Sequence, residues 1–257
     1  MNKLVTTDTV DTQYKNPDKL NIRIRLHHLY STNKEGFNHW IVKHYDLKKE
    51  SSILELGCGT GITWKEHKNL LHDCKEVYVT DLFEGMIEEA KTNIGEYSNI
   101  HYEVVNAEEL PYEDERFDIV IANMMLYHIP NLDKALSEIR RVLKKNGIFY
   151  CATYGENGVE SFINKMLNVQ TERQHTFTLQ NGKGILEDWF SDVEKLEYDD
   201  KLLISNRSDL VEYIQSFKEM NEWQNYSDEE LYRLISNYEK QGIIKIPKEY
   251  GMFVSRK

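Results

Sequence analysis

Three glycines at alternate positions, directly after a short apolar segment, restrict this chain to a small number of folds. Residues 53–56 are apolar apart from Glu55, and Gly57, Gly59 and Gly61 follow them. Glycine permits a tight turn, close approach of the backbone to a ligand, and close packing of a helix on the preceding strand. The pattern therefore predicts a strand, a turn and a helix. An ordinary glycine turn is the alternative interpretation of these residues taken alone.

An acidic residue further along the chain indicates which kind of ligand the glycine turn binds. Asp81 follows the apolar segment of residues 77–80, roughly 20 residues after the turn, where a carboxylate can accept hydrogen bonds from both hydroxyls of a ribose. The glycine turn and Asp81 together indicate a binding site for a nucleoside-type cofactor.

Short apolar segments alternate with amphipathic ones through the middle of the chain, which predicts a parallel sheet with right-handed crossovers and helices on both faces. The clearest helix covers residues 132–145, with Asn131 as its N-cap and Gly147 as its stop. The predicted strands are residues 53–56, 77–80, 101–105, 119–122 and 148–153.

The flanking segments have helical patterns and two further strand patterns. A helix over residues 17–30 is predicted to carry Leu20, Ile24 and His27 on one stripe, and a second helix covers residues 37–45. Later helices are predicted at residues 161–169, 183–190, 208–220 and 228–241, and closing strands, as an antiparallel edge, at residues 193–205 and 250–255. We expect a helical cap at residues 1–46 and one Rossmann-like domain at residues 47–257, with a helical insertion at about 154–190 and further helices at about 208–241.

Charge and composition limit the partners. A net charge of −11 repels a phosphate backbone, so nucleic acid is not expected. A basic cluster lies where a predicted helix ends, and cations favour that end of the helix dipole. Its members are Arg140, Arg141, Lys144 and Lys145.

The sequence also allows predictions of the protein's location in the cell and of its metal content. No apolar run approaches the roughly 20 residues of a membrane span, and residues 1–11 lack the pattern of a signal peptide. The three cysteines are scattered and are expected to be reduced, so we expect a cytoplasmic protein without a membrane partner. The nine histidines include no HExxH pattern, and no metal is expected. Monomer and homodimer both stay open.

The motifs resemble those of the class I S-adenosylmethionine-dependent methyltransferases, specifically the type 11 methyltransferase domain. Residues 55–61, Glu-Leu-Gly-Cys-Gly-Thr-Gly, resemble the first motif of that family, and residues 79–86 are similar to the second. Residues 106–112 resemble the third motif, residues 117–130 the fourth, and residues 141–147 the turn before the fifth strand. The resemblance covers about residues 51–153 and implies a Rossmann-like fold with a mostly parallel, seven-stranded sheet.

The resemblance also implies S-adenosylmethionine as the cofactor and assigns residues to it. Asp81 would hold the ribose and Met86 would pack near the cofactor. Asn106 stands where the family usually has Asp, and its amide oxygen can still accept a hydrogen bond from the adenine amine. The residues expected to contact the cofactor are Glu55, Gly57, Cys58, Gly59, Gly61, Asp81, Leu82, Met86, Asn106, Ala107, Glu108, Asn123 and Met124. An N-terminal segment folds over the cofactor in similar enzymes, and it adds Tyr14, His28 and Tyr30, for which ordinary helix packing is the alternative.

The chemistry expected is transfer of a methyl group from a positively charged sulfur, which is already an activated leaving group. Such a reaction needs in-line positioning, exclusion of water and, for a protonated acceptor, removal of a proton. His128 is the candidate general base, and an ordering role in its loop is the alternative. Contacts with the acceptor are expected from Tyr127, His128, Trp40 and Tyr154.

The acceptor is expected to be a small molecule. No Asn/Asp-Pro-Pro-Tyr/Phe sequence follows the fourth predicted strand, which argues against the amino-group methylases of DNA. The methylated atom stays open among O, N, C and S. Two other functions are compatible with the cofactor site: a cofactor-binding sensor or partner subunit without catalysis, and an NAD-dependent dehydrogenase. A dehydrogenase is expected to have GxGxxG, whereas this turn has GxGxG.

Overall fold

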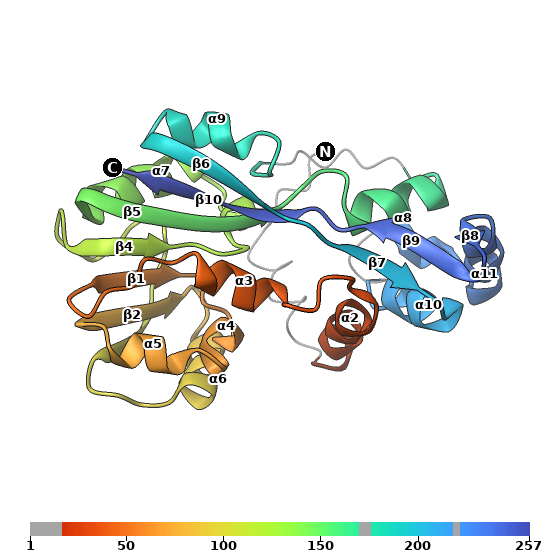
Figure 1. Cartoon of the computed structure of the whole chain (residues 1–257), viewed down its shortest axis with the longest axis horizontal. Coiled ribbons are helices and arrows are strands. Elements are labelled where there is room, and N and C mark those ends of the chain that lie inside the picture. Colours follow the sequence, from red (N-terminus) through yellow and green to blue (C-terminus); the bar gives the residue numbers. More distant parts are fainter. Residues whose placement is uncertain (1–16, 170–175, 218–221) are drawn as a thin grey trace. The chain divides into compact units, whose positions relative to one another are not determined.

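The computed structural model describes residues 17–169, 176–217 and 222–257, and in them the chain forms two compact units (Figure 1). Of the described residues, the larger unit takes 35–154, 176–198 and 250–257, and the smaller unit takes 17–34, 155–169, 199–217 and 222–249. Both units are therefore assembled from segments that are distant in the sequence. The predicted domain limits, residues 1–46 and 47–257, are not decided by this packing and stay a prediction.

The larger unit is built on a seven-stranded sheet with the order β3-β2-β1-β4-β5-β10-β6. The five strands from β3 to β5 run parallel, while β10 is antiparallel to both β5 and β6. The strands are β1 (Ser52–Leu56), β2 (Glu76–Asp81), β3 (Ile100–Val104), β4 (Phe117–Ile121), β5 (Leu143–Tyr154), β6 (Ser191–Tyr198) and β10 (Tyr250–Arg256). The strand order reverses between β1 and β4, and in open α/β sheets ligands bind where the loops after two such strands diverge.

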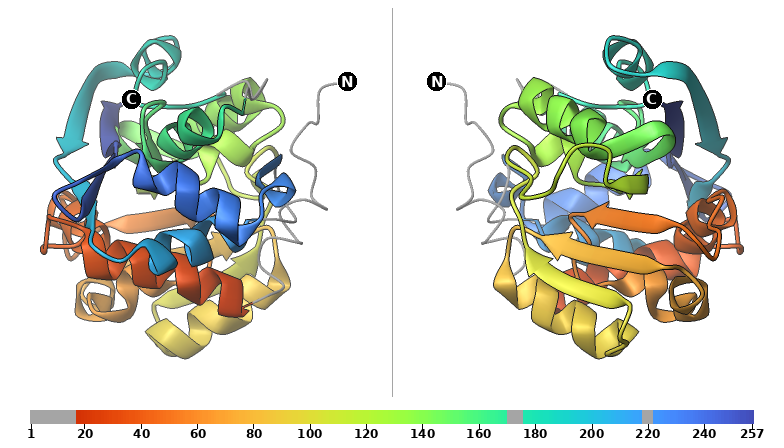
Figure 2. Two further views of the ribbon diagram at one scale, coloured as in Figure 1. Left: turned by 90° about the vertical axis from the view of Figure 1, so that its right-hand side faces the viewer. Right: turned by 90° about the vertical axis from the view of Figure 1, so that its left-hand side faces the viewer.

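Helices cover both faces of this sheet, as Figure 2 shows for α6 and α7. Leu54, Leu56 and Val120 pack on one face against α7, while Ile53 and Ile119 pack on the other against residues of α3, α4 and α6. This division follows from the alternation of side chains along a strand. The helices are α3 (Phe37–Lys43), α4 (Ile62–Lys65), α5 (Lys68–His72), α6 (Glu84–Ile94), the short 3-10 helix η1 (Leu126–His128), α7 (Leu132–Val142) and α9 (Gly182–Glu187).

The smaller unit packs helices around a three-stranded sheet with the order β7-β9-β8. Its apolar core includes Leu26, Leu202, Ile214 and Ile246. The elements are α2 (Pro17–Tyr30), α8 (Val159–Leu167), β7 (Lys201–Ile204), α10 (Arg207–Gln215), the 3-10 helix η2 (Glu222–Asn225), α11 (Asp228–Ser236), β8 (Glu239–Lys240) and β9 (Ile243–Pro247).

A buried ion pair ties together three chain segments of the smaller unit. Lys248 Nζ lies 2.8 Å from Asp200 Oδ2, and both side chains are buried. Asp200 also accepts hydrogen bonds from the Ser31 hydroxyl and from the backbone N–H of Asn33. Because a buried carboxylate is costly without partners, these bonds fix the segment after α2 to the start of β7.

The structure confirms the five parallel strands and corrects four other predictions. The helix after Asn131 ends at Val142, because Leu143 is extended and pairs with Phe117 of β4; Gly147 therefore lies within β5. The strand predicted at residues 193–205 is two strands, β6 and β7, in different sheets. The helix predicted at residues 228–241 ends at Ser236 and is followed by β8 and β9.

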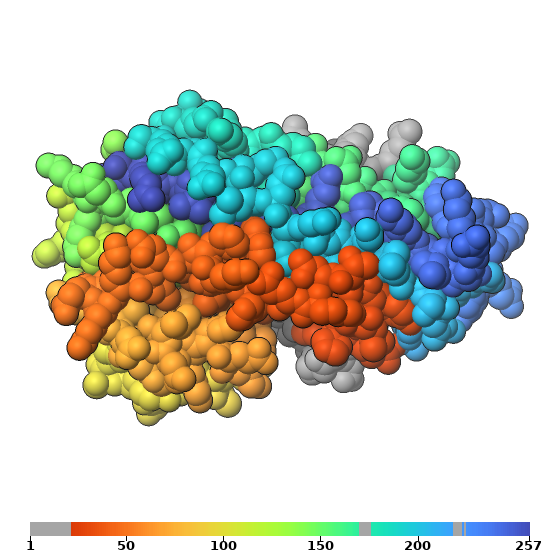
Figure 3. Space-filling model, viewed as in Figure 1, coloured from red at the N-terminus to blue at the C-terminus, as the bar shows by residue number. Residues whose placement is uncertain are grey.

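The apolar stripe predicted for α2 is wrong at one of its positions, Ile24. Ile24 is 55% exposed, while Arg23 and Leu26 are buried. Arg23 can be buried because its guanidinium donates to the carbonyl of Ser216 and lies 3.8 Å from the ring centre of Phe217. In Figure 3, α2 lies at the surface in the red part of the colour scale.

Two structural features are missing from the described part of the chain. Each helix described there is too short or too polar to traverse a bilayer. In the same ranges, no three or more His, Cys, Asp or Glu side chains come together as a metal site would require.

Candidate functional site

The glycine turn after β1 has the backbone conformation that its sequence predicts. Gly57, Gly59 and Gly61 have φ angles of 65°, 54° and 69°, in the left-handed region that favours glycine. A Cβ atom on Gly57 would lie 2.9 Å from the side chain of Met125, and one on Gly61 would lie 3.1 Å from the backbone of Ala90 in α6. Packing therefore requires glycine at the first and third positions.

Gly59 differs from Gly57 and Gly61, because no described residue other than its two chain neighbours has an atom within 4 Å of the position that a Cβ would take. Its backbone faces open space at the carboxyl edge of the sheet. Packing within the described residues does not require a glycine here; the left-handed φ of 54° favours one, and the open backbone also permits close approach of a ligand.

Asp81, the last residue of β2, is held beside this turn. Its Oδ2 accepts a hydrogen bond of 2.9 Å from Gly59 N–H, and its Oδ1 accepts one of 3.1 Å from Phe83 N–H. Burial raises the pKa of the Asp81 carboxyl, and these backbone hydrogen bonds partly offset that effect. Each carboxylate oxygen can accept a further hydrogen bond, so the arrangement fits the two adjacent hydroxyls of a ribose.

Glu55 on β1 is a second carboxyl group at this edge, and it is 3% exposed. The indole N–H of Trp64, in α4, donates to Glu55 Oε2 over 2.7 Å. Burial raises the pKa of Glu55 to about 7; the Trp64 hydrogen bond lowers it and the charge of Asp81 raises it further. Trp64 could not be predicted as a site residue from the sequence, since a tryptophan nine residues after Glu55 belongs to no motif.

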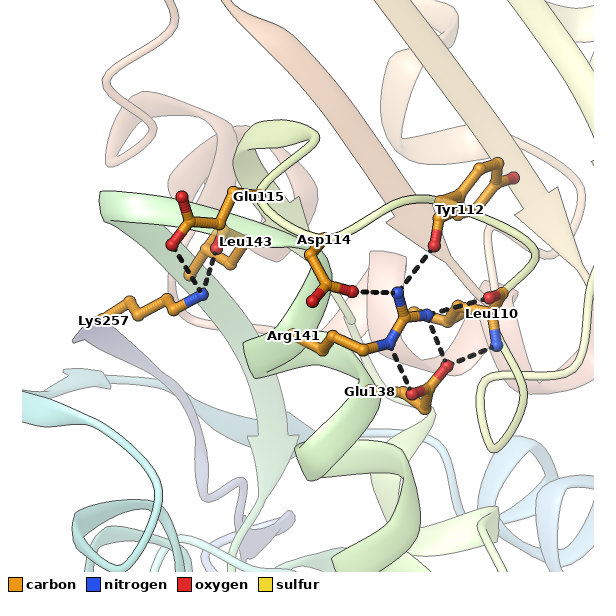
Figure 4. A network of polar contacts seen from close by, with 8 residues as sticks. All are labelled: Leu110, Tyr112, Asp114, Glu115, Glu138, Arg141, Leu143 and Lys257. Carbon is orange, nitrogen blue, oxygen red and sulfur yellow. Dashed lines mark hydrogen bonds and ion pairs between the residues drawn. The ribbon is translucent and has the colours of Figure 1, made fainter.

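The loop between β3 and β4 is anchored to α7, and Figure 4 shows this network. Arg141 donates to the backbone carbonyls of Leu110 and Tyr112 over 3.0 and 2.7 Å and to Asp114 over 2.8 Å. Glu138 pairs with Arg141 and accepts from the N–H of Leu110. Arg141 is thus a structural anchor for the loop, rather than only a solvated helix end.

The predicted cofactor residues of this loop make contacts within it. Asn106 is exposed, and its Oδ1 accepts from the N–H of Glu108 over 2.9 Å. Glu108 Oε1 accepts from the N–H of Asn131 at the start of α7. Ala107 is buried. The expected contact of Asn106 with adenine stays a prediction, because its amide oxygen already holds the local turn.

The loop after β4 lies next to the glycine turn, because Met125 packs against Gly57. Met124 has a φ of 54°, a left-handed conformation that is uncommon outside glycine, and its N–H donates to the carbonyl of Ala152. Asn123 Nδ2 donates to the hydroxyl of Tyr45 over 2.6 Å. Strained backbone of this kind is frequent at functional sites.

Aromatic rings meet at the carboxyl ends of β4 and β5. The Tyr127 ring centre lies 4.4 Å from that of His128 and 4.6 Å from that of Tyr154. Thr176 donates through its hydroxyl to the carbonyl of Tyr127 over 3.2 Å. The structure thus brings together three of the four residues predicted to contact the acceptor.

Other predicted contacts lie elsewhere. Trp40 is buried against Phe37 and Tyr198 in the core of the larger unit. Tyr30 belongs to the smaller unit, where its hydroxyl donates to Asp209. His28 is an exposed residue of the same unit. Tyr14 lies outside the described residues. For all four, contact with cofactor or acceptor stays a prediction.

The sheet order, the antiparallel β10, the glycine turn after β1 and the carboxylate after β2 together define the Rossmann-like class I methyltransferase fold. Residues 54–151 match the family model described as a methyltransferase domain. This match confirms the resemblance to S-adenosylmethionine-dependent methyltransferases that the motifs predict.

Comparisons with individual proteins agree with this assignment. The chain is 38% identical, over 104 residues, to the ubiquinone/menaquinone biosynthesis C-methyltransferase UbiE of Hydrogenovibrio crunogenus; the match covers 39% of the chain and 41% of that relative. The chain is also similar to a solved structure of a Bacillus halodurans protein, with a TM-score of 0.59 and 19% sequence identity. The matched region comprises 86% of this chain and 98% of that protein.

A second similar solved structure contains S-adenosylhomocysteine. It is a phosphoethanolamine N-methyltransferase of Haemonchus contortus in complex with phosphomonomethylethanolamine and S-adenosylhomocysteine. The matched region comprises 97% of this chain and 59% of that protein, with a TM-score of 0.57 and 21% sequence identity. At such identities the two structures show the fold alone.

Proposed function

We propose that this chain binds S-adenosylmethionine at the carboxyl edge of the larger sheet and transfers its methyl group to a small-molecule acceptor. The observation that carries the proposal is the Asp81 carboxylate, which the N–H groups of Gly59 and Phe83 orient beside a turn with open backbone. The methyltransferase domain match over residues 54–151 supports it independently.

The residues at this edge fit the parts of the cofactor. Asp81 would accept the ribose hydroxyls, and the exposed apolar side chain of Leu82 would lie against the adenosine. The open backbone of Gly59 would admit the ligand. Glu55, a buried carboxyl group on the adjacent strand, has a pKa of about 7, and a positively charged amino group bound beside it would lower this pKa and favour its ionised form. When bound, the cofactor supplies a methyl group on a positively charged sulfur, an activated leaving group.

The acceptor would be held at the ends of β4 and β5. Tyr127, His128 and Tyr154 contribute aromatic surface there, as a mostly apolar pocket requires. His128 is the candidate to take a proton from an acceptor that carries one. UbiE is named as a C-methyltransferase and the Haemonchus contortus protein as an N-methyltransferase. Carbon and nitrogen therefore both stay open as the methylated atom, together with oxygen and sulfur.

Product analysis tests the proposal. The protein would be incubated with a metabolite extract and methyl-labelled S-adenosylmethionine, and the expected result is S-adenosylhomocysteine together with one labelled small molecule. Formation of S-adenosylhomocysteine that depends on the extract distinguishes an enzyme from a cofactor-binding sensor. Calorimetric binding of NAD without binding of S-adenosylhomocysteine would instead identify a dehydrogenase-type site.

A further inference from the structure

The larger sheet has an open edge at β3. Within the described residues β3 pairs with β2 alone, and Figure 2 shows it as the outermost strand of the sheet. An open edge presents backbone N–H and C=O groups that no neighbouring strand uses, and it can pair with a strand of another chain. The other edge strand, β6, is less suited to such pairing. It carries Glu194, Lys195 and Glu197, and its register with β10 shifts between Val254 and Arg256.

The hydrogen bonds to β2 identify which backbone groups of β3 are open. Val77 of β2 donates through its N–H to the carbonyl of Asn99. At the other end of β3, Val105 donates through its N–H to the carbonyl of Asp81. The odd-numbered residues of this segment therefore direct their backbone groups toward β2. Because these groups alternate between the two sides of a strand, the even-numbered residues direct theirs toward the open edge. The Ile100 N–H donates to Tyr97, so the open groups are the N–H groups of Tyr102 and Val104 and the carbonyls of Ile100, Tyr102 and Val104.

The sequence of β3, Ile-His-Tyr-Glu-Val, is complementary to itself when two copies run antiparallel. A two-fold axis at Tyr102 would place His101 opposite Glu103 of the second copy, and this pair would occur twice. The same register would place Ile100 opposite Val104. Because open backbone groups must face each other, the next registers differ by two residues, and they would place His101 or Glu103 opposite its own counterpart. Like charges directly opposite destabilise a sheet, whereas opposite charges stabilise it, so the sequence favours the register centred on Tyr102.

The side chains at this edge are accessible to a second copy. Val104 is 53% exposed, and an apolar residue placed opposite would remove part of its surface from water. His101 and Glu103 are partly exposed, and they share the face of the sheet opposite to that of Val104. Glu103 Oε2 accepts from the Tyr112 hydroxyl over 2.8 Å, which orients the carboxylate. A carboxylate can accept about four hydrogen bonds, so Glu103 can also accept from a histidine of the second copy.

We propose that β3 pairs with β3 of a second copy of this chain, antiparallel about a two-fold axis at Tyr102, and that the protein is a homodimer joined at this edge. A two-fold contact of this kind uses the same surface of both copies. Tyr102 would exchange two backbone hydrogen bonds with its counterpart, and each Val104 N–H would donate to the Ile100 carbonyl of the other copy. The two larger sheets would then form one continuous sheet. The inference does not depend on the proposed function.

A charge swap tests the register. Sedimentation velocity of the full chain at about pH 6, where histidine carries a positive charge, would measure the Kd of the dimer, which we expect in the micromolar range. His101→Glu and Glu103→His each place like charges opposite one another, and each should raise Kd about tenfold. The double variant, His101→Glu with Glu103→His, restores opposite charges with their positions exchanged. Its Kd should return to within about threefold of the wild type.

A proline substitution tests the backbone hydrogen bonds. Val104→Pro removes an N–H that points to the open edge, and proline is tolerated at such positions of an edge strand. We expect Kd of the dimer to rise about tenfold, because one hydrogen bond is lost in each copy. Val104→Thr is the matched control, since it keeps the N–H and an extended backbone, and its Kd should equal that of the wild type. Thermal unfolding of every variant, recorded at a dilution at which the wild type is monomeric, should show a transition close to that of the wild type.

Three outcomes would overturn the inference. A wild-type protein that sediments as a monomer at about 1 mM has no stable dimer of any kind. A dimer whose Kd is unchanged by Val104→Pro and by both single charge variants is joined at another surface. A double variant that dimerises as weakly as the single variants shows that His101 and Glu103 do not lie opposite one another, and the proposed register is then wrong.

Discussion

The carboxylate of Asp81 orders the glycine turn through Gly59 N–H. We propose that its remaining lone pairs accept the hydroxyls of a ribose. We expect Asp81→Asn to weaken binding of S-adenosylhomocysteine about tenfold, since hydrogen bonds to a charged group are worth roughly 1.5–3 kcal/mol each. Asparagine is preferred to alanine because its side-chain oxygen can still accept from the turn.

Asp118 provides the matched control for this substitution. It lies at the opposite end of the parallel strands, on β4, where its Oδ2 accepts from Ser52 N–H and lies 2.8 Å from Lys144 Nζ. Asp118→Asn also removes one carboxylate charge, and calorimetry should show an unchanged Kd. Equal weakening in both variants would mean that net charge, rather than Asp81, governs binding.

The buried Glu55 makes stability depend on pH. Its folded-state pKa is about 7, above the ordinary value of 4.5, so the folded protein holds a proton that the unfolded chain has released between these values. Stability should therefore fall as pH rises from 4.5 to 7, by about 2–3 kcal/mol for this group alone. Urea unfolding at pH 5 and pH 8 should show a smaller decrease in Glu55→Gln than in the wild type. A decrease of equal size in both would show that other groups cause it.

At the scale of elements, the glycine turn predicts opposite behaviour for two similar substitutions. Gly59→Ala places a methyl group in open space and costs about 1 kcal/mol for its left-handed backbone, but the methyl group blocks the approach of a ligand. Gly61→Ala forces the methyl group against the backbone of Ala90 in α6 and should lower the thermal transition more. We expect Gly59→Ala to remain folded and to lose binding of S-adenosylhomocysteine. Normal binding by Gly59→Ala would show that the ligand does not approach this peptide.

The parallel strands could be predicted because each carries a local signal. Ile53 and Leu54 begin an apolar segment that a glycine turn closes, and the same alternation of apolar segments and helices repeats to β5. β9 gave no such signal: its residues, Ile-Ile-Lys-Ile-Pro, pair with β7 and β8, and neither partner is recognisable as a strand of that sheet until the chain has folded.

The residues of the candidate site also fall into those that a sequence pattern predicts and those that only the fold brings together. Asp81 and the three glycines follow from their spacing, since both belong to one strand–turn pattern. Other contacts join residues that are distant in the sequence. Trp64 contacts Glu55, nine positions away, and Tyr45 contacts Asn123, 78 positions away. Arg141 contacts the loop before β4 across up to 31 positions. No single sequence pattern specifies such pairs, so only the folded structure reveals them.

At the scale of the whole molecule, the two compact units should respond to different perturbations. S-adenosylhomocysteine at a hundredfold excess over Kd stabilises the unit that binds it by about 2.7 kcal/mol. Lys248→Met leaves the buried carboxylate of Asp200 without its cation, which costs about 3–5 kcal/mol within the smaller unit.

Hydrogen exchange measured by mass spectrometry can locate both effects. The ligand should slow exchange in residues 55–61 and 81–86, and Lys248→Met should speed it in residues 200–204. The reverse assignment, with ligand protection confined to the smaller unit, would contradict a cofactor site on the larger sheet.

The position of β10 has a consequence for the order in which the protein can fold during synthesis. β10 lies between β5 and β6, and among the residues that the structure describes β6 pairs with β10 alone. Until residues 250–256 have left the ribosome, β5 exposes an open edge and β6 has nothing to pair with. Open edges are templates for pairing with other chains. The nascent protein therefore depends on a late segment to close its sheet, and translational pausing before residue 250 should favour aggregation over folding.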